Sequence, residues 1–488
     1  MTQLLPRKHV PTILLLTLIA LVSKLIIKYI YHFDFTAIPV LETWHLLNKD
    51  LLVNRPWESL WYLHSQPPLF NGLCSLLIIW FPHHYEGVME LLWFLFGYAQ
   101  TILLYASLYN LTNKRWLSFA ISAYFSITPA FLLYESWYFY TYLGMIFLSW
   151  SLFFLIKYLR TEKFVWGFSL FLLLSVICLT ISMFHLVWLV LIAIGLTIFS
   201  KPHLRKRTVL AAIFPVLMVT GWYAKNKVMF GHFTASTWMG MNIARIMLPL
   251  NRQLPPSIAN DTVRRLADVG PFRCLEEYGP WLPVNNKYKN IPALQEWCKA
   301  SSECNFNHLQ YIWISDKFQE ASMACLKANP KPYLSLIKTS TALYFSPATN
   351  YFAFQKNRSK IMGYENLFNL GYIRIYKDYV FLTNAILFLA YLLVFTAIAY
   401  ILSRKMIRVL AGKEKWDWQD IALIYCVFNI LYLAMAGNLL ELGENMRFRF
   451  QVIPLFLFTL TWLYWNRKWR NTASSDTPTP VKTAQATV

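Results

Sequence analysis

The chain contains a succession of apolar stretches, each close to the roughly 20 residues that a helix needs to cross a bilayer. We place about ten of them along the 488 residues, at 11–31, 88–110, 117–134, 138–156, 165–182, 184–200, 208–224, 380–402, 419–437 and 450–466. Only 14% of the residues are charged, whereas soluble globular chains carry about 25%. The sequence therefore predicts an all-α polytopic membrane protein and argues against an ordinary soluble enzyme.

The formal net charge of +21 would suggest a nucleic-acid partner in a soluble protein. Here the Lys and Arg clusters fall at every second connection between the apolar stretches, as the positive-inside rule expects of cytoplasmic loops. The clusters lie at 7–8, 114–115, 157–163, 201–207, 404–415 and 467–470. We therefore expect both termini in the cytoplasm and no nucleic-acid partner.

The opposite side of the membrane receives the segments from which a site could be built: 32–87, 225–379 and 438–449. The apolar piece 69–82 is too short to span, and we expect an interfacial helix there. This divides the chain into a membrane region (1–224, with its first outer loop), an extracytoplasmic loop or small domain (225–379) and C-terminal membrane helices (380–470). The Ser-, Thr-, Pro- and Ala-rich tail 471–488 is predicted to be disordered.

Four of the seven cysteines lie in the long outer loop: Cys274, Cys298, Cys304 and Cys325. An oxidising compartment would allow one or two disulfides among them, but the pairing cannot be read from the spacing. The spacing fits no zinc pattern either. We therefore predict no metal site and no cofactor.

Two acidic residues, Asp34 and Glu42, follow the first apolar stretch. Glu42 stands in LETWHLLNKDLL, where Trp44, Leu47 and Leu51 suggest an amphipathic helix along the membrane surface. Partial desolvation there would raise the pKa of a carboxyl group and suit Glu42 to accept a proton. The alternative is a solvated residue in a polar loop, and Asp34 is the competing candidate for the same role.

Other charged residues lie at the ends of apolar stretches. Glu135 sits in a very short turn, where it marks either a site or the water interface. Lys24 and Lys28 share one face of the first helix, where they either snorkel to headgroups or bind an anion. His185, flanked by apolar residues, is expected to be a core histidine.

The last outer loop carries Arg447 and Arg449 next to Glu444. Guanidinium groups can hold a phosphate with paired hydrogen bonds, although two arginines at a membrane edge can also contact lipid headgroups. The sequence lacks the patterns of nucleotide-driven pumps, zinc proteases and serine hydrolases: there is no GxxxxGK[ST], HExxH or GxSxG.

With these residues in view, the chain resembles the GT-C glycosyltransferases, and most closely the bacterial relatives of protein O-mannosyltransferases and of the lipid A aminoarabinose transferase. Glu42 corresponds to the family's acidic residue after the first span, and Glu135 to the acidic residue between the third and fourth spans. Three further motifs carry the likeness: QPPLF at 66–70, KN at 225–226 with STWMGMN at 236–242, and ENMRFR at 444–449.

The chain departs from the family at several positions. Relatives often have Asp-Glu where Leu41 and Glu42 stand, so the role of the acid rests on one residue, with Asp34 as a substitute. Gln66 replaces a frequent Lys or His, which makes a carrier-phosphate role doubtful there, and His64 could take it over. Lys225 replaces a common Arg, which keeps the charge but loses the planar fork.

The resemblance implies about ten helices of GT-C type with interfacial helices in the first outer loop. It also implies transfer of a sugar from a polyprenyl-phosphate carrier, with Glu42 as general base and inversion at the anomeric carbon. Arg447 and Arg449 would bind the donor phosphate, with Lys225, His64, Lys24 and Lys28 as further phosphate candidates. Residues that would orient the substrates are Glu135, Glu444, Asn226 and Asn242. The expected acceptor is a glycan, lipid or protein at the outer leaflet.

Two other classes are compatible with the sequence. One is a transporter or lipid flippase, although transporters usually place polar groups near the membrane midplane. The other is an O-antigen polymerase or ligase, in which residues of a large loop would matter more than Glu42. We expect a bacterial inner membrane. The alternative is the endoplasmic reticulum, where Asn260 and Asn357 would be glycosylation acceptors.

The orientation makes a direct prediction. Cysteines introduced at Glu42 and Glu444 should react with a membrane-impermeant thiol reagent added outside, because both positions lie in outer segments. A cysteine at Lys206 should react only after the membrane is permeabilised. Reversed labelling would overturn the orientation, and with it the side on which the site is sought.

Overall fold

The computed structural model describes residues 7–37, 41–251, 261–279, 282–283, 287–368 and 372–473. The predicted tail beyond residue 473 and Asn260 lie outside this range. Within the described residues every named element is a helix, and β structure is confined to two isolated bridges, Thr36 with Trp137 and Cys298 with Cys304. The expectation of an all-helical chain is confirmed.

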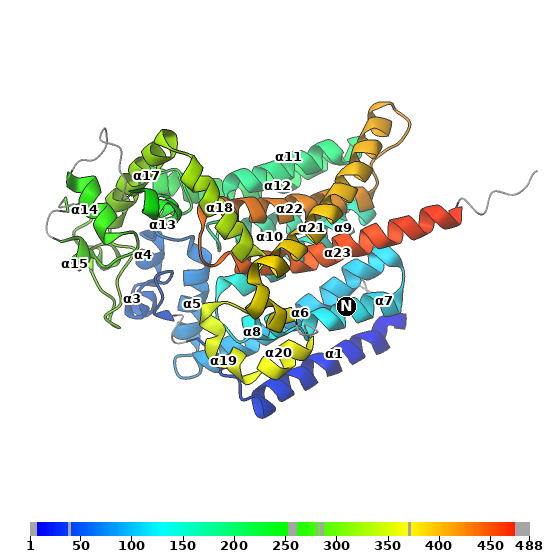
Figure 1. The fold of residues 1–488 in the computed structure, drawn as a ribbon, viewed down its shortest axis with the longest axis horizontal. Helices are drawn as coiled ribbons and strands as arrows, with labels where there is room; N and C mark the ends of the chain where they lie inside the picture. Colours follow the sequence, from blue (N-terminus) through cyan, green and yellow to red (C-terminus); the bar gives the residue numbers. More distant parts are fainter. Residues whose placement is uncertain are drawn as a thin grey trace, which may run out of the picture.

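The long helices lie side by side and form one bundle (Figure 1). They are α1 (Val10–Leu25, continued by a π-helical turn, Ile26–Ile30), α6 (Tyr85–Thr112), α7 (Arg115–Ser126), α8 (Pro129–Glu135), α9 (Tyr140–Thr161), α10 (Phe164–Cys178), α11 (Leu186–Phe199), α12 (Pro202–Phe230), α21 (Tyr372–Leu410), α22 (Trp418–Leu440) and α23 (Asn445–Ala473). A short 3-10 turn, η1 (Arg7–His9), precedes α1.

Six of these helices are long and apolar enough to cross a membrane, judged by length and composition: α1 with its π-helical turn, α6, α9, α12, α21 and α22. The pair α7 and α8, bent by 57° at Ile127–Thr128, would make a seventh if it forms one broken span. Helices α10 and α11 are apolar but shorter. The chain thus has the character of a multi-pass membrane protein, although the expected number of about ten spans is not confirmed.

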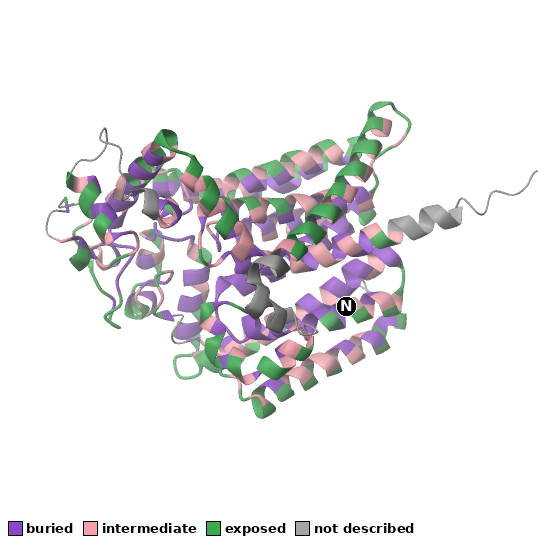
Figure 2. Ribbon diagram, viewed as in Figure 1, coloured by how far each residue is buried: buried purple, intermediate pink, exposed green. Residues whose placement is uncertain are grey.

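Helix α9 is the central element of the bundle. Most of its residues are buried (Figure 2), and it packs against α6, α10, α22 and α23. Two serines of this helix find partners inside the bundle: Ser149 bonds with Gln100, and Ser151 bonds with Tyr425. Buried polar groups need such partners because no water reaches them. The start of α9, at Tyr140, therefore has a fixed position.

The first outer loop differs from the expected single amphipathic helix. Residues 42–46 form turns, and two short helices follow, α3 (Lys49–Asn54) and α4 (Pro56–Trp61). Asn48 caps α3 by accepting a hydrogen bond from the amide of Asp50, and Pro56 starts α4 afresh. The apolar spacing from Trp44 to Leu51 predicts one helix, but the cap at Asn48 and the proline at position 56 divide the segment.

The predicted helix at 69–82 is present as α5 (Pro68–Trp80). One face is buried and the other exposes Leu76, Ile79 and Trp80, while α4 exposes Trp57 and Trp61. Exposed tryptophans of this kind favour the interface between membrane and water. This geometry agrees with an interfacial position for α4 and α5.

The long loop folds into a set of short helices at the same end of the bundle as α3–α5 (Figure 1). They are α13 (Met239–Asn251), α14 (Asp261–Val269), α15 (Leu275–Tyr278), α16 (Pro292–Gln295), α17 (Gln310–Ala328) and α18 (Lys331–Tyr344), followed by η3 (Phe352–Phe354), α19 (Gln355–Lys360) and α20 (Met362–Phe368). A separate apolar core, with Trp238, Tyr311 and Phe318 among its members, holds this region together. Helix α12 extends to Phe230, beyond the expected boundary at residue 224.

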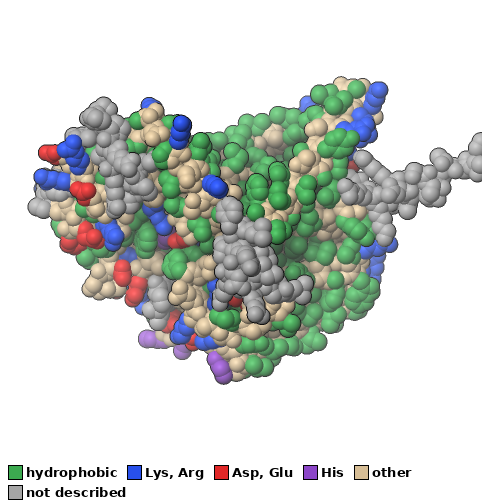
Figure 3. All heavy atoms as spheres, viewed as in Figure 1, with side chains coloured by type: hydrophobic (Ala, Val, Ile, Leu, Met, Phe, Trp, Pro, Cys, Tyr) green, Lys and Arg blue, Asp and Glu red, His purple; other side chains and the backbone are tan. Residues whose placement is uncertain are grey.

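The charges on the face shown in Figure 3 follow this arrangement. A hydrophobic band covers the bundle, acidic and basic side chains mix at the end formed by the long loop, and mostly Lys and Arg mark the opposite end. A band of this kind is the surface that lipid would cover. The two ends of the bundle therefore differ in charge, and which of them faces outside stays a prediction.

The contact between α13 and α17 depends on Gly240. Its amide donates to the Ser315 hydroxyl, and an added Cβ would lie 1.7 Å from the Ser315 carbonyl oxygen. Gly240→Ala should therefore destabilise the protein by about 1–3 kcal/mol or more, because backbone must move. Gly195→Ala, where nothing lies within 4 Å, is the matched control. Equal melting temperatures for the two purified variants in detergent would contradict this account of the packing.

Candidate functional site

A cavity of about 470 Å³ lies where the bundle meets the long loop. Its walls come from the segments around Thr43 and Thr234, the starts of α9 and α23, and the ends of α22 and of the loop before α11. These segments are far apart in sequence, so the cavity exists only when the two outer loops are folded onto the helix ends. It is a site candidate because it is large and combines apolar walls with few polar groups.

Aromatic side chains make up much of the wall. Rings reach the cavity from all three parts of the structure: Trp44 from the first outer loop, Trp137, Phe139 and Tyr140 before and at the start of α9, and Trp238, Phe272 and Tyr351 from the long loop. Several of these rings pack edge to face or stack, such as Trp137 with Phe139 at 4.4 Å between centroids. Such rings offer rigid surfaces with apolar faces.

Two arginine–carboxylate pairs provide the charge. Arg447 Nη2 lies 3.1 Å from Glu444 Oε2, and Arg245 Nη1 lies 2.8 Å from Glu441 Oε1. The Tyr351 hydroxyl donates a further bond of 3.4 Å to Glu444. Arg447 and Glu441 are buried, and burial raises the pKa of Glu441. The Nε atom of Arg447 has no hydrogen-bond partner among the described residues.

Local structure explains how these charges come to face inward. Gly443, with a φ of +117°, makes the turn between α22 and α23, a conformation that favours glycine. The Asn445 side chain then donates to the carbonyls of Gly437 and Glu441 and accepts from the amide of Gly443. Asn445 thus fixes the residues that carry both cavity carboxylates.

His45 lines the cavity beside these pairs. Its ring lies against Phe139, Tyr140 and Trp238, and its Nδ1 atom is buried with no hydrogen-bond partner in the described structure. Burial, and the neighbouring cations Arg447, Lys299 and Arg245, lower the pKa of His45 to about 3. The imidazole is therefore neutral at neutral pH, and its Nδ1 atom is available for a hydrogen bond with a ligand.

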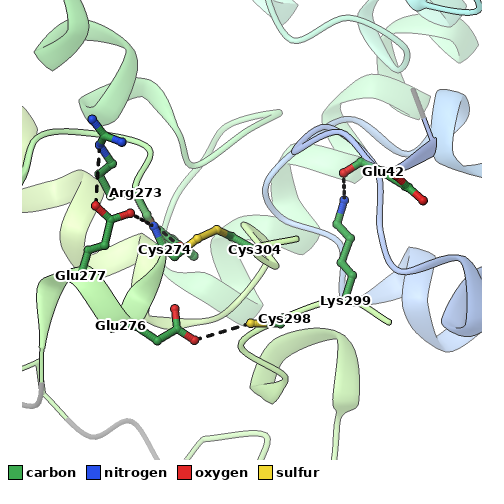
Figure 4. The surroundings of a disulfide bond; sticks show 9 residues. Glu42, Arg273, Cys274, Glu276, Glu277, Cys298, Lys299 and Cys304 are labelled. Atoms are coloured by element: carbon green, nitrogen blue, oxygen red, sulfur yellow. Dashed lines mark hydrogen bonds and ion pairs between the residues drawn. A yellow bond between two sulfur atoms is a disulfide. The ribbon is translucent and has the colours of Figure 1, made fainter. Parts of the chain in front are cut away.

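Glu42 is exposed and is not among the residues that line the cavity, whereas Thr43, Trp44 and His45 are. Its carbonyl oxygen accepts a bond of 3.1 Å from Lys299 Nζ (Figure 4). The carboxyl group therefore stands beside the cavity wall and not in it. The catalytic role of Glu42 stays a prediction.

Asp34, the alternative acid, contacts helix α19. Its Oδ2 lies 3.0 Å from Lys356 Nζ and 2.8 Å from Lys360 Nζ, and these lysines lower the pKa of Asp34. Asn357 bonds to the backbone of Asp34 on both sides, accepting from its amide and donating to its carbonyl. Asp34 is thus placed to dock α19, and the cavity-lining residue of this segment is Thr36.

The residues of the motif after the seventh apolar stretch hold the two outer loops together. The Lys225 ammonium donates to the carbonyls of Trp61 and Leu63, at 3.0 and 2.8 Å. Asn226 donates to the Thr234 carbonyl. Asn242, from the same motif, lines the cavity. Lys225 therefore positions the loop that carries His64 and Gln66, whereas Asn226 fixes the turn after α12.

His64 is fully buried, with Nδ1 at 2.8 Å from the Thr237 hydroxyl and Nε2 at 2.9 Å from the Asn307 carbonyl. Burial and the nearby Lys225 lower the pKa of His64 to about 3. It is neutral at neutral pH, with both nitrogens engaged. Gln66, two residues later, reaches the cavity.

Lys24, Lys28 and Glu135 form a separate ionic ladder with Glu90. Lys24 Nζ lies 3.0 Å from Glu135 and 3.8 Å from Glu90, and Lys28 Nζ lies 3.1 Å from Glu90. These residues line a small pocket on the other side of the wall made by Phe35–Thr36 and Ser136–Trp137. The structure therefore does not bring them together with Arg447.

Arg449 points to a different partner from Arg447. Its Nε donates 2.9 Å to the Tyr344 carbonyl and its Nη2 donates 2.6 Å to the Ser346 carbonyl, at the end of α18. Arg449 is not among the cavity-lining residues. The Nε and Nη2 atoms of Arg449 are thus engaged with backbone carbonyls. The assignment of Arg449 to a phosphate stays a prediction.

Three observations correct or extend the sequence interpretation. His185 lines the cavity and caps α11 through Nδ1, so the expectation of a core histidine is wrong. Cys274 and Cys304 form a disulfide, which answers the open question of pairing for those two. His45, Arg245 and Lys299 were not singled out from the sequence. The signal that was available for His45 was its position three residues after Glu42.

No protein-family model, curated protein or solved structure matches the chain. Among the described residues, no group of three or more His, Cys, Asp or Glu side chains is arranged to hold a metal ion.

Proposed function

We propose that the protein is a membrane glycosyltransferase that moves a sugar from a polyprenyl-phosphate carrier to an acceptor on the outer leaflet of a bacterial inner membrane. The observation that carries the proposal is the cavity at the loop end of the bundle. Its aromatic walls suit the apolar faces of a sugar ring, and Arg447 and Arg245 suit an anionic group. The helix ends around it would let a lipid-linked donor enter from the bilayer.

The proposed reaction needs two groups of the protein, a base and a cation. A base removes the proton of the acceptor hydroxyl, and the freed oxygen attacks the anomeric carbon of the donor. The bond from that carbon to the phosphate oxygen breaks, and the polyprenyl phosphate leaves with the electron pair, inverting the anomeric centre. Arg447 is the group we assign to the charge that develops on this phosphate, because preorganised cations in a water-poor site act strongly there.

Two positions compete for the base. Glu42 is the residue to which the GT-C resemblance points, and Glu444 is a carboxylate that lines the cavity at 3.1 Å from Arg447. Glu42 would need its exposed side chain to turn toward the cavity. Glu444 needs none, and both Arg447 and the Tyr351 hydroxyl contact the same oxygen of its carboxylate, Oε2.

Glu42→Gln and Glu444→Gln should separate these alternatives, with exposed Glu86→Gln in the first turn of α6 as a matched control. If Glu42 is the base, its variant should remain folded in detergent but lose transfer of labelled sugar from a lipid-linked donor by at least about 100-fold. Glu86→Gln should transfer at the normal rate. Near-normal transfer by Glu42→Gln would remove this residue from the catalytic role.

Arg447→Gln should lower the rate of transfer by about 100–1,000-fold, the usual cost of removing one electrostatic partner of a leaving group. Arg449→Gln should mainly lower the melting temperature, because its bonds are to the carbonyls of α18 and the following loop. The measurement is the initial rate per folded protein, with donor in excess. Equal rate losses in both variants would contradict the assignment of the phosphate to Arg447. No transfer by the purified wild-type protein with any lipid-linked donor would favour a transporter.

A further inference from the structure

Lys299 connects the long loop to the cavity wall. Its side chain is buried, and its ammonium donates a hydrogen bond of 3.1 Å to the Glu42 carbonyl (Figure 4). It donates a second one, of 2.6 Å, to the Thr43 carbonyl, and both bonds join residues more than 250 positions apart in the sequence. Bonds from an ammonium to a carbonyl are stronger than neutral ones. Thr43 and the two residues after it line the cavity.

The segment that carries Lys299 is itself held firmly. Lys299 and Asn305 donate backbone bonds to Glu303 and Trp297, at 2.7 and 2.8 Å, and so close a tight hairpin. The disulfide between Cys274 and Cys304 joins this hairpin to α15. A cross-link of this kind restricts the alternative conformations of the loop. The backbone from which the Lys299 side chain reaches the first outer loop is therefore held in one conformation.

The same hairpin region contacts the other side of the cavity segment through Trp44. The Trp44 ring lies 5.1 Å from Phe272 and 5.7 Å from Phe306, residues that neighbour the two halves of the disulfide. Lys299 holds the backbone and these rings hold the side chain. The position of residues 42–45 therefore depends on the long loop.

We propose that Lys299 is a positioning residue that holds the segment 42–45 in place, so that the folded long loop sets the location of His45 and of the candidate base Glu42. This inference rests on the proposed function for its effect on transfer. The holding of the segment itself does not.

Lys299 also responds to pH. Burial lowers the pKa of Lys299 to about 8, while the carboxylates of Glu303 and Glu42 act in the opposite direction. His45, the other titratable group that Lys299 faces, is neutral at this pH. A released Lys299 would have an ordinary pKa near 10.4, so the held state binds fewer protons above pH 8. Raising the pH from 8 to 9 therefore favours the held state.

The test is amide hydrogen exchange of the peptide 41–47 in the purified full-length protein, where the amides of Leu41, Leu46 and Leu47 are hydrogen-bonded. Lys299→Met should accelerate exchange there by about tenfold or more. Lys299→Arg should restore protection, because a guanidinium can donate to both carbonyls. Lys289→Met, at an exposed lysine of the same loop, should leave exchange unchanged.

Unchanged protection in Lys299→Met, or a Lys299→Arg variant as loose as Lys299→Met, would overturn the proposal. Wild-type protection, corrected for the intrinsic rate, should rise by up to about tenfold from pH 8 to 9. It should stay flat in Lys299→Arg, because arginine does not titrate in this range. The same pH dependence of protection in the wild type and in Lys299→Arg would show that the titration of Lys299 does not control the movement of residues 42–45.

Sugar transfer gives the second readout. Lys299→Met should lower kcat by up to about 100-fold, the scale of a misplaced catalytic group, and Lys299→Arg should recover most of it. Because exchange is measured without donor or acceptor, a wild-type protein with no transfer would refute the proposed function and leave the exchange result to decide the role of Lys299. Full transfer by Lys299→Met would overturn its positioning role.

Discussion

The absence of water inside a bilayer is the constraint on which this structure depends. A backbone amide or carbonyl in hydrocarbon must be bonded within the protein, so each membrane-crossing stretch must be a helix. Helices of similar length bring their ends to the same two levels. The irregular backbone that can bear a site is thereby confined to the ends, where residues such as Gly443 can turn the chain and Asn445 can satisfy the freed carbonyls.

At the loop end, the site is assembled from pieces that do not fold together locally. Buried polar side chains join these pieces. Lys225 and Asn307 bond to carbonyls and amides of residues 61–65, and Lys299 donates to the carbonyls of residues 42 and 43. Each of these bonds is specific in direction, and leaving one of its partners buried and unbonded costs about 1–3 kcal/mol. The folded arrangement of both outer loops is therefore selected over alternatives in which the loops pack by apolar contact alone.

The sequence predicts the helices, which depend on nearby residues, but it does not predict contacts between residues that are distant in the chain. The apolar stretches predict the helices and α5, because helix formation depends on nearby residues. The helix expected after Glu42 is wrong because the cap at Asn48 and the proline at position 56 outweigh the apolar spacing. Arg447 could be found from its motif and does line the cavity.

Distant partners set the limit of such predictions. Arg245 pairs with Glu441, 196 residues away in the sequence. No sequence pattern in either segment predicts this ion pair. Arg449 has the same chemistry as Arg447 and lies two residues away, yet it bonds to the end of α18. The sequence therefore identifies candidate site residues by their chemistry. Whether each side chain points into the site is decided by the fold.

The paired charges of the cavity have a consequence for the proposed chemistry. Arg447 and Arg245 are matched by Glu444 and Glu441, so these four side chains add little net charge to the cavity. An entering phosphate would compete with Glu444 for Arg447, whose Nε atom has no hydrogen-bond partner in the described part of the chain. A carboxylate that loses its cation in a poorly solvated site becomes a stronger base. On the proposed function, donor binding would therefore activate a proton acceptor in the same cavity at the moment when the acceptor hydroxyl needs one.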